Sequence, residues 1–142
     1  AHDLKIFLDT IPGNDLILVG ISGGGLTCLE YLSEESAWKR VKLFIAVGAP
    51  FKGAVAGFLM PFSKPRSELI NDSKYSRELL KKPILHKDRI ICIAAVSDQM
   101  VGHDNSLLPG TRHVIINVVG HNPIHTIWLP TWKKIFELAS EA

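Results

Sequence analysis

A serine surrounded by small residues, Ser22, is the first feature of the sequence that could carry chemistry. It lies in the run Gly20 to Gly24 (GISGG), which fits the pattern G-x-S-x-G directly after an aliphatic run and directly before a helical pattern. A sharp turn from strand to helix needs residues without bulky side chains on both sides, and it lifts the serine hydroxyl above the end of the sheet. The pattern therefore favours a serine nucleophile.

A nucleophilic serine needs a base to accept its proton and an acid to orient that base. Two polar residues that follow later aliphatic runs suit these roles. Asp98 follows the run Arg89 to Val96, and His121 follows the run His113 to Val119. Open parallel sheets place their sites at the carboxyl ends of the strands. The order Ser22, Asp98, His121 therefore predicts one catalytic group at that edge.

The same glycine-rich turn could instead hold a phosphate at the start of a helix. A P-loop needs a lysine after its glycines, and a dinucleotide fingerprint needs an acid at the end of the next strand. Here Gly25 is followed by Leu-Thr-Cys, and the next aliphatic run ends in Gly48-Ala49-Pro50. A phosphate or nucleotide binder, and a non-catalytic binding or scaffolding protein on the same fold, are the alternatives to an enzyme.

Metal binding is a further hypothesis for one part of the sequence. His125 follows His121 by four residues, a spacing that can place two ligands on one face of a helix. Pro123 interrupts such a helix, and no other histidine or cysteine pair has ligand spacing. We therefore expect neither a metal nor a cofactor.

Four short aliphatic runs, and helical patterns around them, must position these residues. The runs are Asp15 to Gly20, Val41 to Gly48, Arg89 to Val96 and His113 to Val119. Mostly aliphatic runs of strand length are typical of a parallel sheet covered on both faces. Apolar residues at helical spacing predict helices before the first run, after it and at the end of the chain, where Trp132, Ile135, Phe136 and Ala139 share one face. The fold class predicted is α/β, a mostly parallel sheet flanked by helices.

A long excursion separates the second and third aliphatic runs, over residues 51–86. It opens with the apolar stretch Gly53 to Phe62 and continues in a predicted helix near Ser67 to Lys82. An excursion of this length inside a compact domain is often a lid or cap. A surface helix on an apolar tether is the alternative.

Length and composition fit one globular domain over residues 1–142. The chain is 46% hydrophobic and 21% charged, with a formal net charge of +2. Such a chain can bury most of its apolar surface, and its composition excludes disorder, collagen-like repeats and a disulfide scaffold. Lysines and arginines are scattered among acids without a basic stripe, so we expect no nucleic-acid partner.

The cysteines and the apolar runs bear on the environment of the protein. Cys28 and Cys92 each lie in an apolar stretch and are expected to be buried free thiols. No apolar run approaches the roughly 18 residues of a membrane-spanning helix. The first five residues also lack the basic region of a secretion signal. We expect no integral membrane segment. The compartment stays open, with a cytoplasmic location favoured over the alternatives.

Taken together, these motifs resemble the second half of an α/β-hydrolase of the lipase and esterase kind. LILVGISGGGLTCLEYL is similar to the strand, nucleophile elbow and helix of such lipases, and VKLFIAVGAPFKG to their strand running into a G-[TA]-P-x-x-G turn. SDQMVGHDNSLLPGTRHVIINVVGHNPI is similar to their acid strand and to the Gly-His end of the strand that follows. The resemblance extends over residues 4–140.

The resemblance implies a role for each matching residue. Ser22 would be the nucleophile, His121 the base and Asp98 the acid, with the Gly23 backbone N–H as one oxyanion donor. It also implies further strands before this sequence and an early loop that gives a second oxyanion N–H. We therefore expect a fold truncated at its N-terminus, in which the strand Asp15 to Gly20 offers an exposed sheet edge for self-association.

The reaction expected from these residues is hydrolysis of a carboxylic ester by a Ser-His-Asp mechanism. The apolar stretch that includes Phe58 and Leu59 indicates an acyl or other hydrophobic substrate, a small-molecule ester or a lipid. We expect these two side chains, with Ile21 and Met100 beside the catalytic residues, to contact it. Thioesters and amides stay open as substrates.

Overall fold

The computed structural model describes residues 1–54, 74–121, 124 and 129–142. In chain order the elements are α1 (His2–Thr10), β1 (Leu16–Ile21), α2 (Gly23–Tyr31), η1 (Glu35–Lys39), β2 (Val41–Val47), α4 (Lys74–Lys81), η3 (Lys87–Arg89), β3 (Ile90–Ser97), η4 (His103–Ser106), β4 (Arg112–Val119) and α6 (Leu129–Glu141), where η marks a 3-10 helix. The four predicted strands are confirmed, each end within one residue of its expected position.

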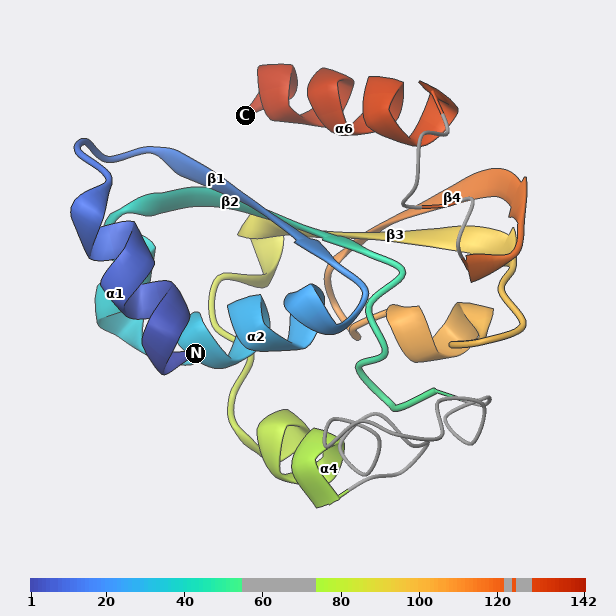
Figure 1. The fold of residues 1–142 in the computed structure, drawn as a ribbon, viewed down its shortest axis with the longest axis horizontal. Helices are drawn as coiled ribbons and strands as arrows, with labels where there is room; N and C mark the ends of the chain where they lie inside the picture. The colour runs from blue at the N-terminus through green and yellow to red at the C-terminus, as the bar shows by residue number, and fades with distance from the viewer. Residues whose placement is uncertain (55–73, 122–123, 125–128) are drawn as a thin grey trace.

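The four strands form one parallel sheet in the order β1-β2-β3-β4. Strands that follow each other in sequence are therefore neighbours in space. Parallel neighbours need crossover connections, and Figure 1 shows α2 on one side of the sheet and α6 on the other. The predicted fold class, an α/β fold with a parallel sheet flanked by helices, is confirmed.

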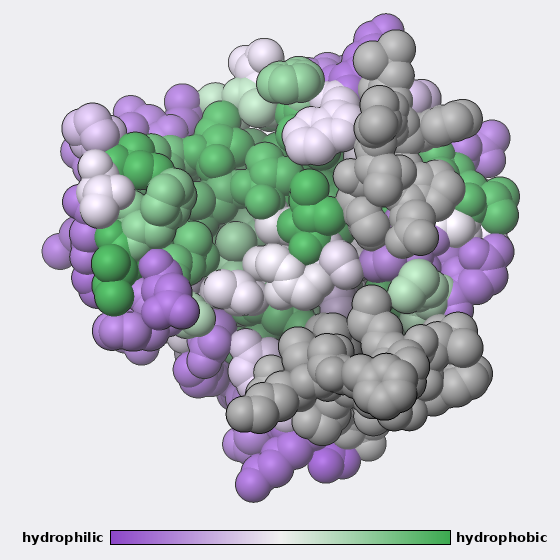
Figure 2. Space-filling model, in the orientation of Figure 1, coloured by the Kyte–Doolittle hydropathy of each residue, from purple (hydrophilic) through white to green (hydrophobic). Residues whose placement is uncertain are grey.

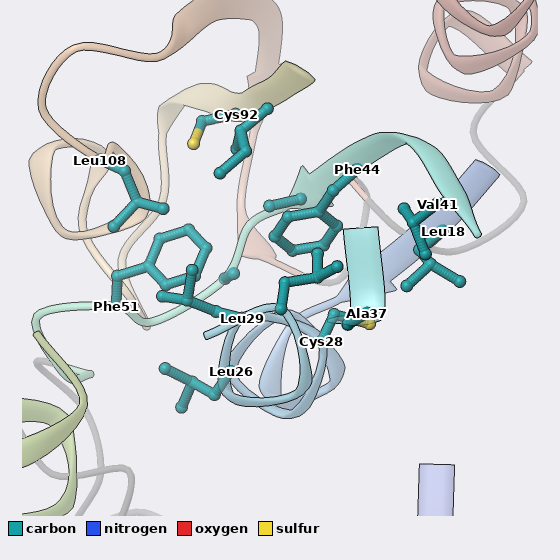
Figure 3. Close-up of a cluster of buried hydrophobic side chains, with 14 of the residues drawn as sticks. Leu18, Leu26, Cys28, Leu29, Ala37, Val41, Phe44, Phe51, Cys92 and Leu108 are labelled. Atoms are coloured by element: carbon teal, nitrogen blue, oxygen red, sulfur yellow. The ribbon is translucent and has the colours of Figure 1, made fainter. Parts of the chain in front are cut away.

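Each face of the sheet packs against a separate hydrophobic cluster. Alternate residues of β2 point to opposite faces, as the pleat requires: Phe44 lies in the cluster under α2, and Ile45 lies in the cluster under α6. Figure 3 shows Phe44 and Phe51 gathered around Leu29 of α2. Both clusters include side chains of the strands, so packing on the two faces together holds the strands in place.

The two cysteines lie in the cluster under α2 as buried free thiols, as expected. Burial raises the pKa of the Cys28 thiol to about 11. Cys92 also has a raised pKa because burial outweighs its hydrogen bonds. Both side chains therefore act as small apolar groups at neutral pH.

The face predicted for α6 is buried at Ile135, and Trp132 packs against the same cluster, but Phe136 departs from it. Ile135 and Leu138 are buried, whereas Phe136 is 67% exposed. Phe136 was expected beside Ile135 on the core side. Neighbouring residues on a helix differ in direction by about 100°, so only one of the two can point at the sheet. Ile135 and Leu138 are the residues of α6 that lie in the cluster between this helix and the sheet.

Strand β1 forms one edge of the sheet within the described chain. Val19 of this strand is 36% exposed, and hydrophobic side chains gather on the surface over β1 and β2 in Figure 2. Self-association through this edge stays a prediction.

Only part of the excursion lies among the described residues. Helix α4 falls within the predicted helix, and the Tyr75 hydroxyl lies 3.0 Å from the Glu30 carboxylate, which ties α4 to α2. Phe58 and Leu59 lie outside the described residues, so their contact with substrate and a lid role for the excursion stay predictions. In the part of the chain that the structure describes, no helix is long and apolar enough to cross a membrane.

Candidate active site

Ser22 occupies the turn between β1 and α2. Its backbone has φ 50° and ψ −125°, a conformation that a residue with a side chain adopts at a cost of about 1–3 kcal/mol. Two hydrogen bonds of 2.9 Å hold the turn: the Ser22 amide donates to the Val47 carbonyl, and the Gly25 amide donates to the Ser22 carbonyl. The backbone of Ser22 is thus held by both β2 and α2.

Two glycines around Ser22 allow the strand and the helix to meet. A Cβ on Gly20 would lie 2.7 Å from the Gly25 Cα, and a Cβ on Gly25 would lie 2.3 Å from the Ala49 Cβ. Both distances are too short for any side chain. A Cβ on Gly24 would meet nothing within 4 Å. Of the two glycines that define the G-x-S-x-G pattern, packing therefore requires Gly20 but not Gly24, and the second required glycine, Gly25, directly follows the pattern.

His121 follows the end of β4 and points its ring at Ser22. The preceding Gly120 has φ 101° and donates its amide to the Ser97 carbonyl at 2.6 Å, which turns the chain at the strand end. His121 Nε2 lies 2.9 Å from Ser22 Oγ, and His121 Nδ1 lies 2.7 Å from Asp98 Oδ2. The structure thus brings together the three residues selected from the sequence.

Asp98 is buried and fully supplied with hydrogen bonds. Its Oδ1 accepts from the amides of Met100 and Val101, both at 3.0 Å. Burial alone would raise the pKa of Asp98. The hydrogen bonds from the His121 ring and from the two amides, together with electrostatic attraction to His121, outweigh burial and hold this pKa below its ordinary value of 3.8.

The ionised carboxylate determines which nitrogen of His121 carries the proton. A carboxylate only accepts hydrogen bonds, so the Nδ1–H of His121 donates to Asp98. The lone pair of Nε2 then accepts a hydrogen bond from the Ser22 hydroxyl. The arrangement can remove a proton from Ser22 and hold the resulting positive charge next to a negative one.

The other residues selected from the sequence lie near the three side chains or contact them only through the backbone. Gly23 begins α2 directly after Ser22, and Ile21 is half-buried against the cluster under α6. Met100 is half-buried and reaches Asp98 through its backbone amide. Roles for Gly23 as an oxyanion donor, and for Ile21 and Met100 as substrate contacts, stay predictions. His125 lies outside the described residues.

Two contributors to the site escaped the sequence reasoning. The Val101 amide supports Asp98, and Gly48 lies against the His121 ring, where a Cβ would be 3.4 Å from Cε1. Gly48 could be noticed in the sequence as the glycine that ends the run Val41 to Gly48. Its proximity to His121 could not be predicted from local spacing. Among the described residues, no group of three histidine, cysteine, aspartate or glutamate side chains could hold a metal ion.

No protein-family model matches this sequence, and no curated protein matches it either. Solved structures do match. A metagenomic carboxyl esterase is 15% identical, with a TM-score of 0.76, over 97% of this chain and 60% of that chain. The mature lipase of Bacillus licheniformis is 17% identical, with a TM-score of 0.63, over 97% of this chain and 69% of that chain.

A third similar structure is an α/β-hydrolase enzyme from the metagenome of lagoon sediments of Mar Chica, Morocco. It is 17% identical, with a TM-score of 0.63, over 99% of this chain and 68% of that chain. The chain thus spans about two thirds of the length of these structures. Identities this low establish a common fold and nothing finer.

Proposed function

We propose that this chain, which has the fold of the α/β-hydrolases, hydrolyses carboxylic esters with Ser22 as nucleophile, His121 as base and Asp98 as the acid that orients it. One observation carries the proposal: a continuous chain of hydrogen bonds, 2.9 Å and 2.7 Å long, from the serine hydroxyl to the buried carboxylate. Lipases and esterases among the similar structures support the reaction class.

The geometry supports a two-step acyl transfer. Ser22 Oγ attacks the ester carbonyl while His121 Nε2 accepts its proton, and the same proton then passes to the departing alcohol oxygen as the C–O bond breaks. Water, activated by His121 in the same way, releases the acid from Ser22. The Gly23 N–H at the start of α2 would share the negative charge of the carbonyl oxygen in both steps.

Exposure differs among the three side chains in a way that suits this reaction. The His121 and Asp98 side chains are only 5% and 1% exposed, whereas Ser22 is half-buried. Electrostatic interactions between the base and the acid are therefore weakly screened, because little water reaches them. The nucleophile stays within reach of a substrate.

The phosphate-binding alternative has weaker support. The turn after β1 has no lysine to meet a phosphate, and the hydroxyl at its centre is hydrogen-bonded to a histidine. A non-catalytic protein on this fold would not need that bond. The proposed substrate is a small-molecule ester or a lipid.

A fluorophosphonate probe and a short p-nitrophenyl ester test the proposal. We expect the probe to label the wild-type chain and Ser140→Ala, a control in which an exposed serine of α6 is lost, but not Ser22→Ala. Ser22→Ala should keep its fold by circular dichroism and lose on the order of 10⁶-fold in turnover. Turnover within tenfold of wild type would remove Ser22 from the mechanism, and retention on a nucleotide resin would favour the phosphate-binding alternative.

A further inference from the structure

The turn after β2, formed by Gly48 and Ala49, lies between helix α2, which follows the nucleophile, and the ring of the base. On one side, the fully buried methyl group of Ala49 lies so near Gly25 of α2 that a Cβ there would be 2.3 Å away. On the other side, a Cβ on Gly48 would lie 3.4 Å from Cε1 of the His121 ring. Both contacts are to backbone or ring atoms that cannot swing away freely.

The sheet holds this turn firmly. The Gly48 amide donates to the Ile93 carbonyl at 2.9 Å, which extends the pairing of β2 with β3 by one residue. The Ser22 amide donates to the Val47 carbonyl, the residue just before the turn. The turn and the nucleophile are thus fixed to the same strand, and the ring of the base lies beside that turn.

We infer that the Gly48-Ala49 turn is a spacer that sets the distance between the nucleophile, which directly precedes α2, and the base, which follows β4. The inference rests on the proposed function, since it assigns Gly48 as a positioning residue for the proposed base. Ala49 meets the helix with one methyl group, and Gly48 meets the imidazole with no side chain at all.

The absence of a side chain at Gly48 matters because of the atom that it faces. Cε1 lies between the two ring nitrogens of His121, so a push on Cε1 moves Nδ1 and Nε2 together. A Cβ on Gly48 would also lie 3.3 Å from the Cγ2 of the fully buried Ile124, which would have to give by a few tenths of an ångström. A Cβ alone would fill the space up to the ring, so a side chain larger than alanine is expected to displace the ring and lengthen its hydrogen bonds to Asp98 and Ser22.

A second explanation for glycine at this position is backbone conformation alone. Gly48 has φ 55°, where alanine is strained but asparagine is tolerated much better. A purely conformational role predicts that asparagine is the milder replacement. The spacer predicts the opposite order, because asparagine is larger and must move the ring farther.

The experiment compares Gly48→Ala and Gly48→Asn with Gly13→Ala and Gly13→Asn. Gly13 has φ 92° and a Cβ there would meet nothing within 4 Å, so this pair reports the backbone effect alone. For each variant we would measure Tm, kcat and KM for a p-nitrophenyl ester, and the rate of fluorophosphonate labelling. The downfield proton resonance of the His121 Nδ1–H bond to Asp98 would report ring position without any turnover.

We expect Gly48→Asn to lower kcat and the labelling rate about ten- to a hundredfold, since misplacement by about 1 Å can cost about a hundredfold. KM should stay near wild type, the His121 resonance should shift, and Gly48→Ala should lie in between. The Gly13 pair should change Tm only. Should both Gly48 variants fail to fold, Ala49→Gly decides, since loss of the spacer methyl should still slow labelling several-fold.

The inference is overturned if Gly48→Asn labels as fast as Gly48→Ala or faster, if the His121 resonance does not move, or if Ala49→Gly labels at the wild-type rate when it is the deciding variant. Failure of the proposed function gives a different result. In that case wild type itself would show no labelling or turnover, while the His121 resonance would still move in Gly48→Asn and support the spacer.

Discussion

Replacing Asp98 by asparagine separates the orientation of His121 from the rest of the site. Oδ1 of Asp98 accepts hydrogen bonds from two backbone amides, and Oδ2 accepts one from the His121 ring. In Asp98→Asn the carbonyl oxygen must face the two amides, because only an acceptor satisfies them. The NH₂ group then faces His121 Nδ1. Two donors cannot share a hydrogen bond, so the ring proton moves to Nε2.

The expected loss follows from that proton. With Nε2 protonated, His121 cannot accept the proton of Ser22, although the positions of all three side chains are kept. A tautomer change of this kind costs on the order of 10⁴ in kcat. At 1.36 kcal/mol for each tenfold step, this corresponds to about 5.4 kcal/mol of transition-state stabilisation.

The assay is hydrolysis of a short p-nitrophenyl ester at neutral pH, with urea unfolding in parallel. Asp104→Asn is the matched control, because Asp104 is an exposed residue of the neighbouring 3-10 helix η4. Asp98→Asn should lose turnover with little change in KM and stay folded, with a stability loss of about 1–2 kcal/mol for exchanging charged for neutral hydrogen bonds. Turnover within tenfold of wild type would refute the assignment of Asp98 as the orienting acid.

Three further outcomes are expected. The folded-state pKa of Asp98 lies below 3.8, so the stability that its carboxylate contributes is present above that pH and is lost as the pH falls through the lower folded-state value. Urea unfolding of wild type and Asp98→Asn over this range should therefore show the difference between their free energies of unfolding shrinking in acid. Gly25→Ala should destabilise the chain by about 1–3 kcal/mol or prevent folding, whereas Gly24→Ala, with open space around it, should stabilise it by about 0.4–1 kcal/mol, and equal Tm values for the two would contradict the packing argument. Thr131→Val should raise the free energy of unfolding by about 1 kcal/mol, because the buried Thr131 hydroxyl has no hydrogen-bond partner among the residues that the structure describes, and a lower Tm would show that the hydroxyl is satisfied in solution.

Much of this architecture is encoded locally and could therefore be predicted. Aliphatic runs of strand length indicated the strands to within one residue, because strands covered on both faces leave few polar positions. Ser22, Asp98 and His121 each follow such a run, and parallel strands bring their carboxyl ends to one edge. Local pattern and strand direction together were enough to select these three side chains.

What could not be predicted depends on contacts between distant segments. Gly48 ends an aliphatic run like any turn residue, and its proximity to the His121 ring appears only once three strands are in register. The buried face of α6 has the same origin. The apolar residues of α6 include Trp132, Ile135 and Phe136, and their spacing allows more than one face to be buried. Contact with the sheet decides that the face with Ile135 is buried and that Phe136 is exposed.

The hydrogen bond between Ser22 and His121 joins residues 99 positions apart. Every strand of the sheet lies between them in the chain or ends beside one of them, so this bond closes the longest loop that the site requires. Contacts of such high sequence separation slow folding, because the entropy of loop closure must be overcome before they contribute, and we expect this one to form after the local contacts. During refolding, reactivity at Ser22 would thus return after the helices and after most of the fluorescence and circular dichroism signals. A chain that already looks native by those probes can still lack the bond between its first and last strands.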